Sequence, residues 1–462
     1  MLLSSLGTSV ANVALPTLAQ AFAASFQQVQ WVVLAYLLAV TVPIVSVGRL
    51  GDLTGRRRLL LAGIFLFTAA SVLCGMAGSL WMLTAARALQ GLGAAVMMAL
   101  TVAVVGDAAP EARTGTAMGL LGTMSAVGTA LGPSLGGVLL AGFGWRAIFF
   151  VNLPLGGLTL LLAHRHLPVD RRAPPADSAA FDTAGTLLLA LALAAYALAM
   201  TTGRGHFGAR NVALLLVAGA AGGLFVLVEG RAASPLLRLS MLRDPALAAS
   251  LAMSALVSTV MMATLVVGPF YLSRGLGLDV ALVGLALSAG PLVSALTGVP
   301  AGLVVDRLGA RRMTRVGLGG MLAGSAVLAV TPAISGVAAY IAETVVITAG
   351  YALFQAANNT AIMTHVGPQQ RGVIAGMLGL SRNLGLITGA SVMGALFAFA
   401  SATIDVTTAR PEAVASGMRV TFAAAAALSG AALALALASG RTVSAAKRRA
   451  PNEACGDGRP GR

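Results

Sequence analysis

The stretch Gly48-Arg49-Leu50-Gly51-Asp52-Leu53-Thr54-Gly55-Arg56-Arg57-Arg58 decides how the chain is built, because a second copy follows 254 residues later. That copy reads Gly302-Leu303-Val304-Val305-Asp306-Arg307-Leu308-Gly309-Ala310-Arg311-Arg312. Both copies follow the pattern G-x3-D-x2-G-x-R-R, and each joins two long apolar stretches. A charged, glycine-rich hairpin at the same place in two hydrophobic halves indicates a duplicated membrane bundle. Transporters are commonly built this way, with the working site between the halves.

The composition predicts an all-α integral membrane protein. Hydrophobic residues make up 58% of the chain and charged residues 10%, whereas soluble domains carry about a quarter charged residues. The net charge of +15 does not indicate nucleic acid as a partner, because the basic residues lie in short loops without interleaved aromatic residues. Arginines at the edges of a bilayer meet anionic headgroups instead. Cys74 and Cys455 lie in different environments and indicate neither a disulfide nor a metal site.

Fourteen stretches approach the roughly 20 apolar residues that a membrane-spanning helix needs. They are approximately 2–22, 29–48, 59–78, 81–105, 115–140, 147–163, 183–201, 211–229, 246–272, 280–301, 315–331, 336–362, 373–400 and 417–439. If the first hairpin is cytoplasmic, 22 basic residues lie on its side and six on the other. The positive-inside rule then predicts that both termini are cytoplasmic, in a multi-pass protein of the cell membrane. Met1 already lies in an apolar stretch with no basic region before it, so we expect no cleavable signal and an upstream start codon.

The predicted spans divide into two pseudo-symmetric six-helix bundles with an inserted helix pair between them. The predicted segments are an N-terminal bundle over 1–165, a cytoplasmic linker over 166–182, the inserted pair over 183–229, a second cytoplasmic linker over 230–245, a C-terminal bundle over 246–440 and a cytoplasmic tail over 441–462.

Four further motifs support a family resemblance that covers about residues 6 to 440. Arg87 to Gly93 contains R-x-x-Q-G, and Gly128 to Gly137 reads G-x3-G-P-x2-G-G. Trp31 to Tyr36 and Trp145 to Pro154 complete the set. With the two hairpins, these motifs resemble the major facilitator superfamily, and in particular its fourteen-span drug:proton antiporter branch.

One position departs from that branch. Leu6 to Pro16 resembles its first-span motif, which usually has aspartate where this chain has Gly7. An acid there is often linked in the family to cation or proton handling. The departure puts specificity for polycationic drugs in doubt and places any proton path elsewhere.

The two hairpins are candidate gates. We expect Asp52 and Asp306 near the start of the following helix, where a carboxylate caps free N–H groups and meets the positive end of the dipole. The arginines are expected to bridge to helix ends or to the other bundle and hold the cytoplasmic side shut. The alternative is that they only fix topology against lipid phosphates while the aspartates only cap. The candidate gating residues are Gly48, Asp52, Gly55, Arg56, Arg57, Gly302, Asp306, Gly309 and Arg311.

The glycine motif of the fifth span predicts close helix packing and a kink. Small residues at four-residue spacing let another helix approach, and proline interrupts the backbone. The resemblance links this motif to export by sealing a leak path, and the alternative is ordinary packing. Its residues are Gly128, Gly132, Pro133, Gly136 and Gly137; Gly385 and Gly389 repeat the spacing without proline and indicate packing alone.

Ionisable groups inside spans are costly and therefore candidate functional residues. Arg87 and Glu343 are each expected about 10 Å below the outer face, at 1.5 Å per residue. The resemblance implies that their helices border the cavity from opposite bundles, so the two side chains could face each other or share a substrate or a proton. Alternatively, Arg87 bonds backbone carbonyls, and Glu343 stays neutral or reaches the surface. The candidate pathway residues are Arg87, Gln90, Glu343, Asn12, Gln355, Asn358, Arg382 and Asn383, of which Arg382 and Asn383 fit packing better than substrate contact.

The favoured function is therefore proton-coupled export of a small lipophilic substrate by alternating access, with the chain working as a monomer and without a cofactor. A carrier for one endogenous metabolite is the alternative within this class. A membrane enzyme is disfavoured because no cluster of catalytic or metal-binding residues occurs, and a sensor because no extramembrane domain occurs. No phosphate-binding loop of the G-x4-G-K-[ST] kind is present, which excludes ATP as the energy source.

Overall fold

The computed structural model describes residues 1–44, 47, 50–51, 54–108, 114–167, 182–202, 208–231, 241, 243–331, 336–363, 371–401 and 409–449. All regular secondary structure in these residues is helical. The first group of helices comprises α1 (Leu2–Val13), α2 (Leu15–Ala21), α3 (Phe26–Thr41), α5 (Arg56–Gly75), α6 (Leu80–Ala108), α7 (Thr114–Phe143), α8 (Ala147–Phe150) and α9 (Asn152–His166). The second comprises α10 (Thr183–Thr201) and α11 (Ala209–Glu229). The third comprises α12 (Pro245–Phe270), η3 (Tyr271–Gly275), α13 (Val280–Leu308), α14 (Ala310–Val330), α15 (Gly336–Met363), α16 (Arg371–Thr388), η6 (Gly389–Met393), α17 (Gly394–Ala400) and α18 (Pro411–Arg449).

Fewer of the described helices qualify as membrane spans than the fourteen that the sequence predicts. In the described residues, 11 helices are long and apolar enough to cross a bilayer, or 12 if the bent pair α1 and α2 forms one span. The segments 26–41 and 127–143 are apolar helices of only 10–17 residues. Every predicted stretch overlaps a helix, but the structure does not show fourteen crossings, and that number stays a prediction.

Local sequence explains where several helices begin and bend. Ser25 and Gln28 form a capping box at the start of α3. Asp279 caps α13 by accepting a bond from the Leu282 N–H at 2.9 Å. The axis bends by 59° between α1 and α2, where Pro16 supplies no N–H to continue the helical bonding.

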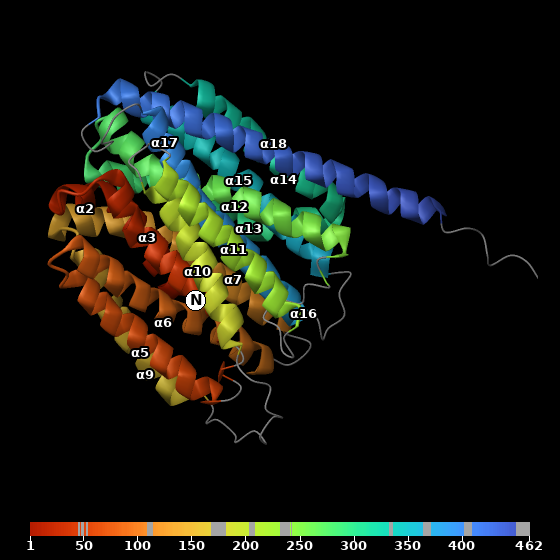
Figure 1. Ribbon diagram of the computed structural model, residues 1–462, viewed down its shortest axis with the longest axis horizontal. Coiled ribbons are helices and arrows are strands. Elements are labelled where there is room, and N and C mark those ends of the chain that lie inside the picture. Colours follow the sequence, from red (N-terminus) through yellow and green to blue (C-terminus); the bar gives the residue numbers. More distant parts are fainter. Residues whose placement is uncertain are drawn as a thin grey trace, which may run out of the picture.

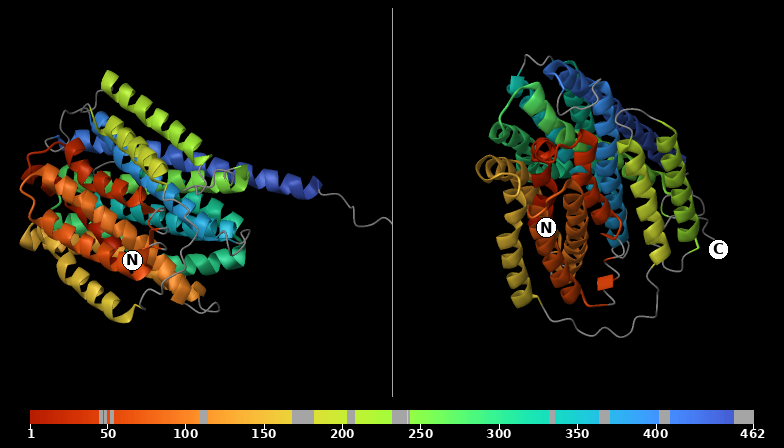
Figure 2. Two further views of the ribbon diagram at one scale, coloured as in Figure 1. Left: turned by 60° about the horizontal axis from the view of Figure 1, so that its bottom comes forward. Right: turned by 60° about the vertical axis from the view of Figure 1, so that its left-hand side comes forward.

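The helices fall into neighbouring groups that follow the chain (Figure 1). The first and third groups each pack largely among themselves, as in the pairs α5–α6, α1–α7, α14–α15 and α14–α18. The pair α10 and α11 lies against one flank of the molecule, as the right-hand view of Figure 2 shows. The described part of α18 continues beyond the other helices (Figure 1).

Helix α10 is attached to both groups. The Trp31 indole N–H of α3 donates to the Thr201 hydroxyl at 3.1 Å. The Tyr196 hydroxyl donates to the Thr388 hydroxyl of α16 at 3.2 Å. The inserted pair therefore touches the first and third groups through side-chain hydrogen bonds.

Candidate functional site

Arg87 is fully buried and joins three helices of the first group. Its Nε donates to the Val32 carbonyl of α3 and its Nη1 to the Gly7 carbonyl of α1, both at 3.0 Å. Nη1 also donates to Gln90 Oε1 at 2.5 Å, and the guanidinium lies 4.2 Å from the centre of the Tyr36 ring. Gln90 in turn donates to Ser71 Oγ of α5 at 2.6 Å. This geometry matches the backbone-carbonyl alternative for Arg87, while Nη2 has no hydrogen-bond partner among the described residues.

Gly7, where the resemblance leads us to expect aspartate, lies directly against this network. A Cβ atom at this position would be 2.8 Å from Phe67 Cζ, so the Phe67 ring occupies the space of a side chain. In the described residues no carboxylate pairs with Arg87, and the charge is met by carbonyls and the Tyr36 ring. Asn12, further along α1, donates to the Thr8 carbonyl at 3.3 Å, and its Oδ1 is buried without a partner among the described residues.

Glu343 lies in the third group, away from the Arg87 network. Its Oε1 accepts from the Thr331 hydroxyl at the end of α14 at 2.5 Å, and its Oε2 is buried without a partner among the described residues. No recorded partner is shared with Arg87, so this conformation shows no direct contact between the two. The idea that they share a proton or substrate stays a prediction.

The remaining polar candidates divide between packing and partial exposure. Asn358 bonds reciprocally with Ser250 of α12, accepting from its hydroxyl and donating to its carbonyl, and so ties α15 to α12. Asn383 is buried, and Arg382 and Gln355 are half-buried.

The glycine motif of α7 has two rows that meet different helices. Gly128, Gly132 and Gly136 face α1, where Cβ atoms would run into Leu2, Ser9 and Val10. Pro133 and Gly137 face Gly284 of α13: a Cβ at Gly137 would lie 2.9 Å from Gly284 Cα, and one at Gly284 would lie 2.8 Å from the Pro133 carbonyl oxygen. One helix thus packs inside the first group with one row and onto the third group with the other.

The α1–α7 contact is repeated in the third group by α12 and α16. Ser9 Oγ donates to the Gly128 carbonyl at 3.4 Å, and Thr259 Oγ1 donates to the Gly385 carbonyl at 3.1 Å. Gly389 packs on Thr259 in the same way. This repetition agrees with an internal duplication.

The two hairpins share one backbone feature. Gly55 and Gly309, at the same motif position, have φ values of 99° and 88°, a region that favours glycine over other residues. Gly48 and Asp52 lie outside the described residues. Arg57 donates to the His164 carbonyl at the end of α9 at 2.7 Å, and Gly302 and Arg311 lie on α13 and α14.

The predicted capping role of Asp306 is wrong. Asp306 lies in the last turn of α13 and is exposed, whereas α14 begins after Gly309 without a side-chain cap. The positive φ of Gly309 turns the chain only after Asp306 has been included in the preceding helix.

The first and third groups also meet at one end through residues that the motifs do not contain. Phe26 stacks edge-on with Phe270 and Phe397 at centroid distances of 4.8 and 5.5 Å. Gln30 donates to the Ala390 carbonyl of η6 at 3.0 Å. We call this the closed end. Gln30 could have been noticed as an amide inside an apolar stretch, but its partner 360 residues away could not.

The fold and the packing define a multi-pass membrane protein with two related helix groups joined at one end. The chain matches the sequence profile of the Major Facilitator Superfamily over residues 1–390, and it belongs to that family. It is accordingly a secondary transporter of small molecules and not an enzyme.

Among relatives, the multidrug resistance protein Stp of Mycobacterium tuberculosis is 33% identical over 86% of this chain and 74% of its own. The riboflavin transporter RibZ of Clostridioides difficile is 30% identical over 86% of each chain. A solved bacterial homolog of the human lysosomal transporter Spinster, in an inward-facing conformation, has a TM-score of 0.69 at 18% identity, covering 96% of this chain and 95% of its own. At that identity the likeness shows the fold alone.

Proposed function

We propose that this transporter exports lipophilic compounds in exchange for protons, by alternating access across the cell membrane. The observation that carries the proposal is the double packing of α7, whose Pro133 and Gly137 face α13 while its other glycines face α1. A helix packed in this way can seal one end of the path between the groups and release it when they rock apart. Its motif resembles that of antiporters, and the multidrug resistance relative supports a drug-like cargo.

The proposed architecture follows the sequence boundaries. The bundles 1–165 and 246–440 rock against each other, the linkers 166–182 and 230–245 flank the inserted pair 183–229, and the tail 441–462 is cytoplasmic. The closed end is the outer one, since most basic residues belong to the opposite side. Fourteen spans, cytoplasmic termini and action as a monomer belong to this proposal.

The positive charge of Arg87 restricts the classes of cargo that we expect. The first group holds a buried guanidinium next to Gly7 with no carboxylate partner among the described residues. Such a region repels a cation approaching from the path and tolerates neutral or anionic groups. We therefore place neutral and anionic lipophilic compounds ahead of polycations. A carrier for one metabolite is the second candidate, which the riboflavin transporter relative favours.

Inside-out vesicles from cells that express the protein test the proposal directly. An acidic lumen is imposed, and accumulation of a neutral dye, a cationic dye and riboflavin is followed. We expect accumulation of the neutral dye, and its loss when a protonophore collapses the gradient; vesicles without the protein are the control. Accumulation that ignores the protonophore would contradict proton coupling, and accumulation of riboflavin alone would favour the single-metabolite carrier.

A further inference from the structure

One face of α15 carries a row of buried hydroxyls with no assigned role. Tyr340, Thr344 and Thr348 follow at four-residue spacing, so each is turned by only about 40° from the previous one and lies about 6 Å further along the axis. Their exposed fractions are 2%, 6% and 2%. By distance and angle, none of the three hydroxyl oxygens makes a hydrogen bond among the described residues, although the Tyr340 and Thr344 side chains are neighbours. Burying a hydroxyl without a partner destabilises a protein, so a row of three calls for an explanation.

Two glycines leave the space that this row occupies. A Cβ atom at Gly268 of α12 would run into the Tyr340 hydroxyl. A Cβ at Gly290 of α13 would lie 3.1 Å from Thr348 Oγ1 and 3.4 Å from Thr344 Cγ2. The hydroxyls therefore lie in a narrow slot between α12, α13 and α15. Their burial leaves no room for a lipophilic cargo, but a proton can pass where water molecules bridge such hydroxyls into a hydrogen-bonded chain.

Glu343 stands at one end of the row. It lies one turn from Tyr340, and its Oε2 is buried without a partner among the described residues. Tyr271 of η3 lies beside the first hydroxyl of the row, with its ring centre 5.8 Å from that of Tyr340. An acid that can bind a proton therefore adjoins the first hydroxyl of the row.

The row covers about 12 Å of the helix axis and ends near the middle of a bilayer. Thr348 lies 12 residues after Gly336, where α15 begins, which corresponds to about 18 Å. The hydrocarbon core is about 30 Å thick, and transporter sites lie near its middle. Beyond Thr348 the same face continues with Tyr351 and Gln355, both half-buried, so the row ends where the helix becomes more accessible.

We propose that Glu343, Tyr340, Thr344 and Thr348 form a proton relay from the closed end to the middle of the membrane, with Tyr271 holding the entrance. The relay rests on the proposed proton coupling and gives it a path. Glu343 takes up a proton, and water molecules that bridge the hydroxyls, which are spaced about 6 Å along the axis, carry it to Tyr340, then to Thr344 and on to Thr348. Each hydroxyl gains one proton and gives one away, so only the position of the charge changes, and the hydroxyls rotate back afterwards.

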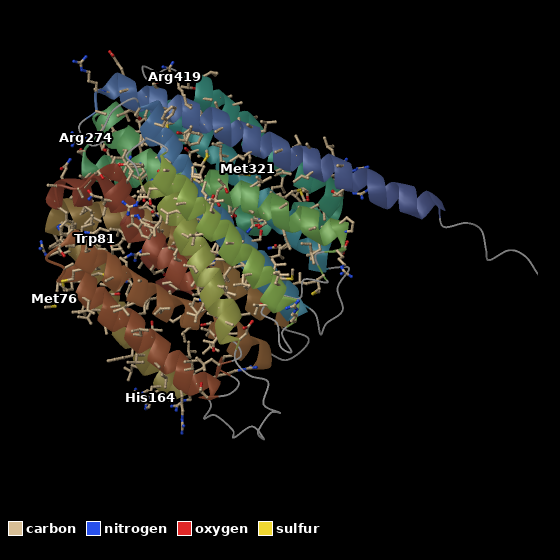
Figure 3. The ribbon with its side chains drawn as sticks, viewed as in Figure 1. Met76, Trp81, His164, Arg274, Met321 and Arg419 are labelled. Carbon is tan, nitrogen blue, oxygen red and sulfur yellow. The ribbon has the colours of Figure 1, made fainter. Side chains whose placement is uncertain are left out.

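Few other charges act on the entrance. Among the described residues, the Glu343 carboxylate accepts a hydrogen bond from Thr331 of α14 and makes no ion pair. Figure 3 places Arg274 of η3 and Arg419 of α18 at the edge of the molecule at this end. The relay therefore begins at a carboxyl that is not held by a fixed cation.

Replacing one hydroxyl by a methyl group tests the relay. In Thr344→Val, we expect transport driven by a pH gradient to fall about 100-fold, the usual weight of a proton-transferring group, while downhill exchange of cargo stays within about twofold. Thr344→Ser keeps the hydroxyl and should restore driven transport. Thr421→Val is the matched control, because Thr421 is a buried threonine whose hydroxyl already donates to the Gly417 carbonyl of its own helix at 2.8 Å. Tyr340→Phe should behave like Thr344→Val.

The outcomes separate the relay from the proposed function. Driven transport at the wild-type level in both Thr344→Val and Tyr340→Phe would overturn the relay and leave proton coupling intact. Loss of downhill exchange together with driven transport, not restored by Thr344→Ser, would show a packing role and also overturn it. A wild-type protein that ignores the pH gradient fails at the first step, and then proton coupling itself is wrong.

Discussion

At the scale of single residues, Arg87 shows how a membrane protein holds a charge that it does not pair with an acid. Its planar fork reaches two backbone carbonyls, the amide of Gln90 and the face of Tyr36. Bonds from a charged donor are worth about 1.5–3 kcal/mol each, and they fix three helices relative to one another. Lysine has the same charge but not the fork.

Arg87→Lys should therefore lower both stability and transport. One ammonium cannot reach the Val32 and Gly7 carbonyls with the same geometry, so we expect a loss of at least about 2 kcal/mol. Thermal unfolding in detergent measures the stability, and vesicle transport measures the activity. Arg419→Lys, at an exposed position, is the control. An unchanged unfolding temperature in Arg87→Lys would mean that the fork is not a structural joint.

The hairpin glycines lead to a second prediction at the scale of single residues. Gly309 has a φ of 88°, so Gly309→Ala should cost about 1–3 kcal/mol through backbone strain. Gly302→Ala is the control, because a Cβ there would have nothing within 4 Å and the position is helical. Membrane abundance and unfolding temperature of the two variants should differ. Equal behaviour would show that the turn relaxes at no cost.

At the scale of elements, α7 illustrates how one helix serves two neighbours. Its rows of small residues are one position apart, and that single step turns the contact from α1 to α13. Substitutions in the two rows are therefore expected to have different effects. A side chain added to the first row disturbs packing inside one group, and one added to the second disturbs the joint between groups.

Gly137→Leu should wedge α7 from α13 while the first group stays folded. A Cβ at this position already lies 2.9 Å from Gly284 Cα, closer than side-chain atoms normally approach. We expect near-normal membrane abundance, cargo binding within about threefold and a loss of net export of about tenfold or more. Gly142→Leu has open space and serves as the matched control. Net export at the wild-type level in Gly137→Leu would reduce the second row to passive packing.

The sequence predicts the helices of this fold well and their neighbours poorly. Apolar length alone locates every helix, and the repeated hairpin with its glycine at the turn reveals the duplication. The direction in which a side chain faces is not encoded in apolar length, because lipid and protein neighbours are equally apolar. The sequence therefore locates Arg87 and Glu343 within their helices but does not reveal their partners, and it gives no signal for the contact at Gly284. Asp306 lies in α13 and not at the start of α14, because the chain turns only at Gly309, after two intervening residues.

At the scale of the whole molecule, the inserted pair is the part that a twelve-helix duplication does not explain. Its helices pack on each other, and α10 contacts both neighbouring groups through hydrogen bonds with Trp31 and Thr388. Whether both helices of the pair cross the membrane decides between the fourteen-span arrangement and a smaller number of crossings.

Accessibility reporters at positions 205 and 236 distinguish these arrangements. If α11 crosses the bilayer, a cysteine or tag at 205 is labelled from outside and one at 236 from the cytoplasm. Reporters at 25 and 309 provide the outer and inner references. Labelling of 205 and 236 from the same side would show that α11 does not cross, and the fourteen-span proposal would be wrong.

The two side-chain hydrogen bonds of α10 affect how long the transporter stays closed at this end between transport cycles. Trp31 on one side and Thr388 on the other are both attached to this helix, so the halves cannot part at the closed end while both bonds hold. Each hydrogen bond contributes about 1 kcal/mol, so thermal motion breaks it often. The inserted pair therefore holds the two helix groups together only weakly. We expect a substitution of Thr201 or Tyr196 to change the lifetime of the conformation that is closed at this end. Neither residue belongs to the proposed path of the cargo or of the proton.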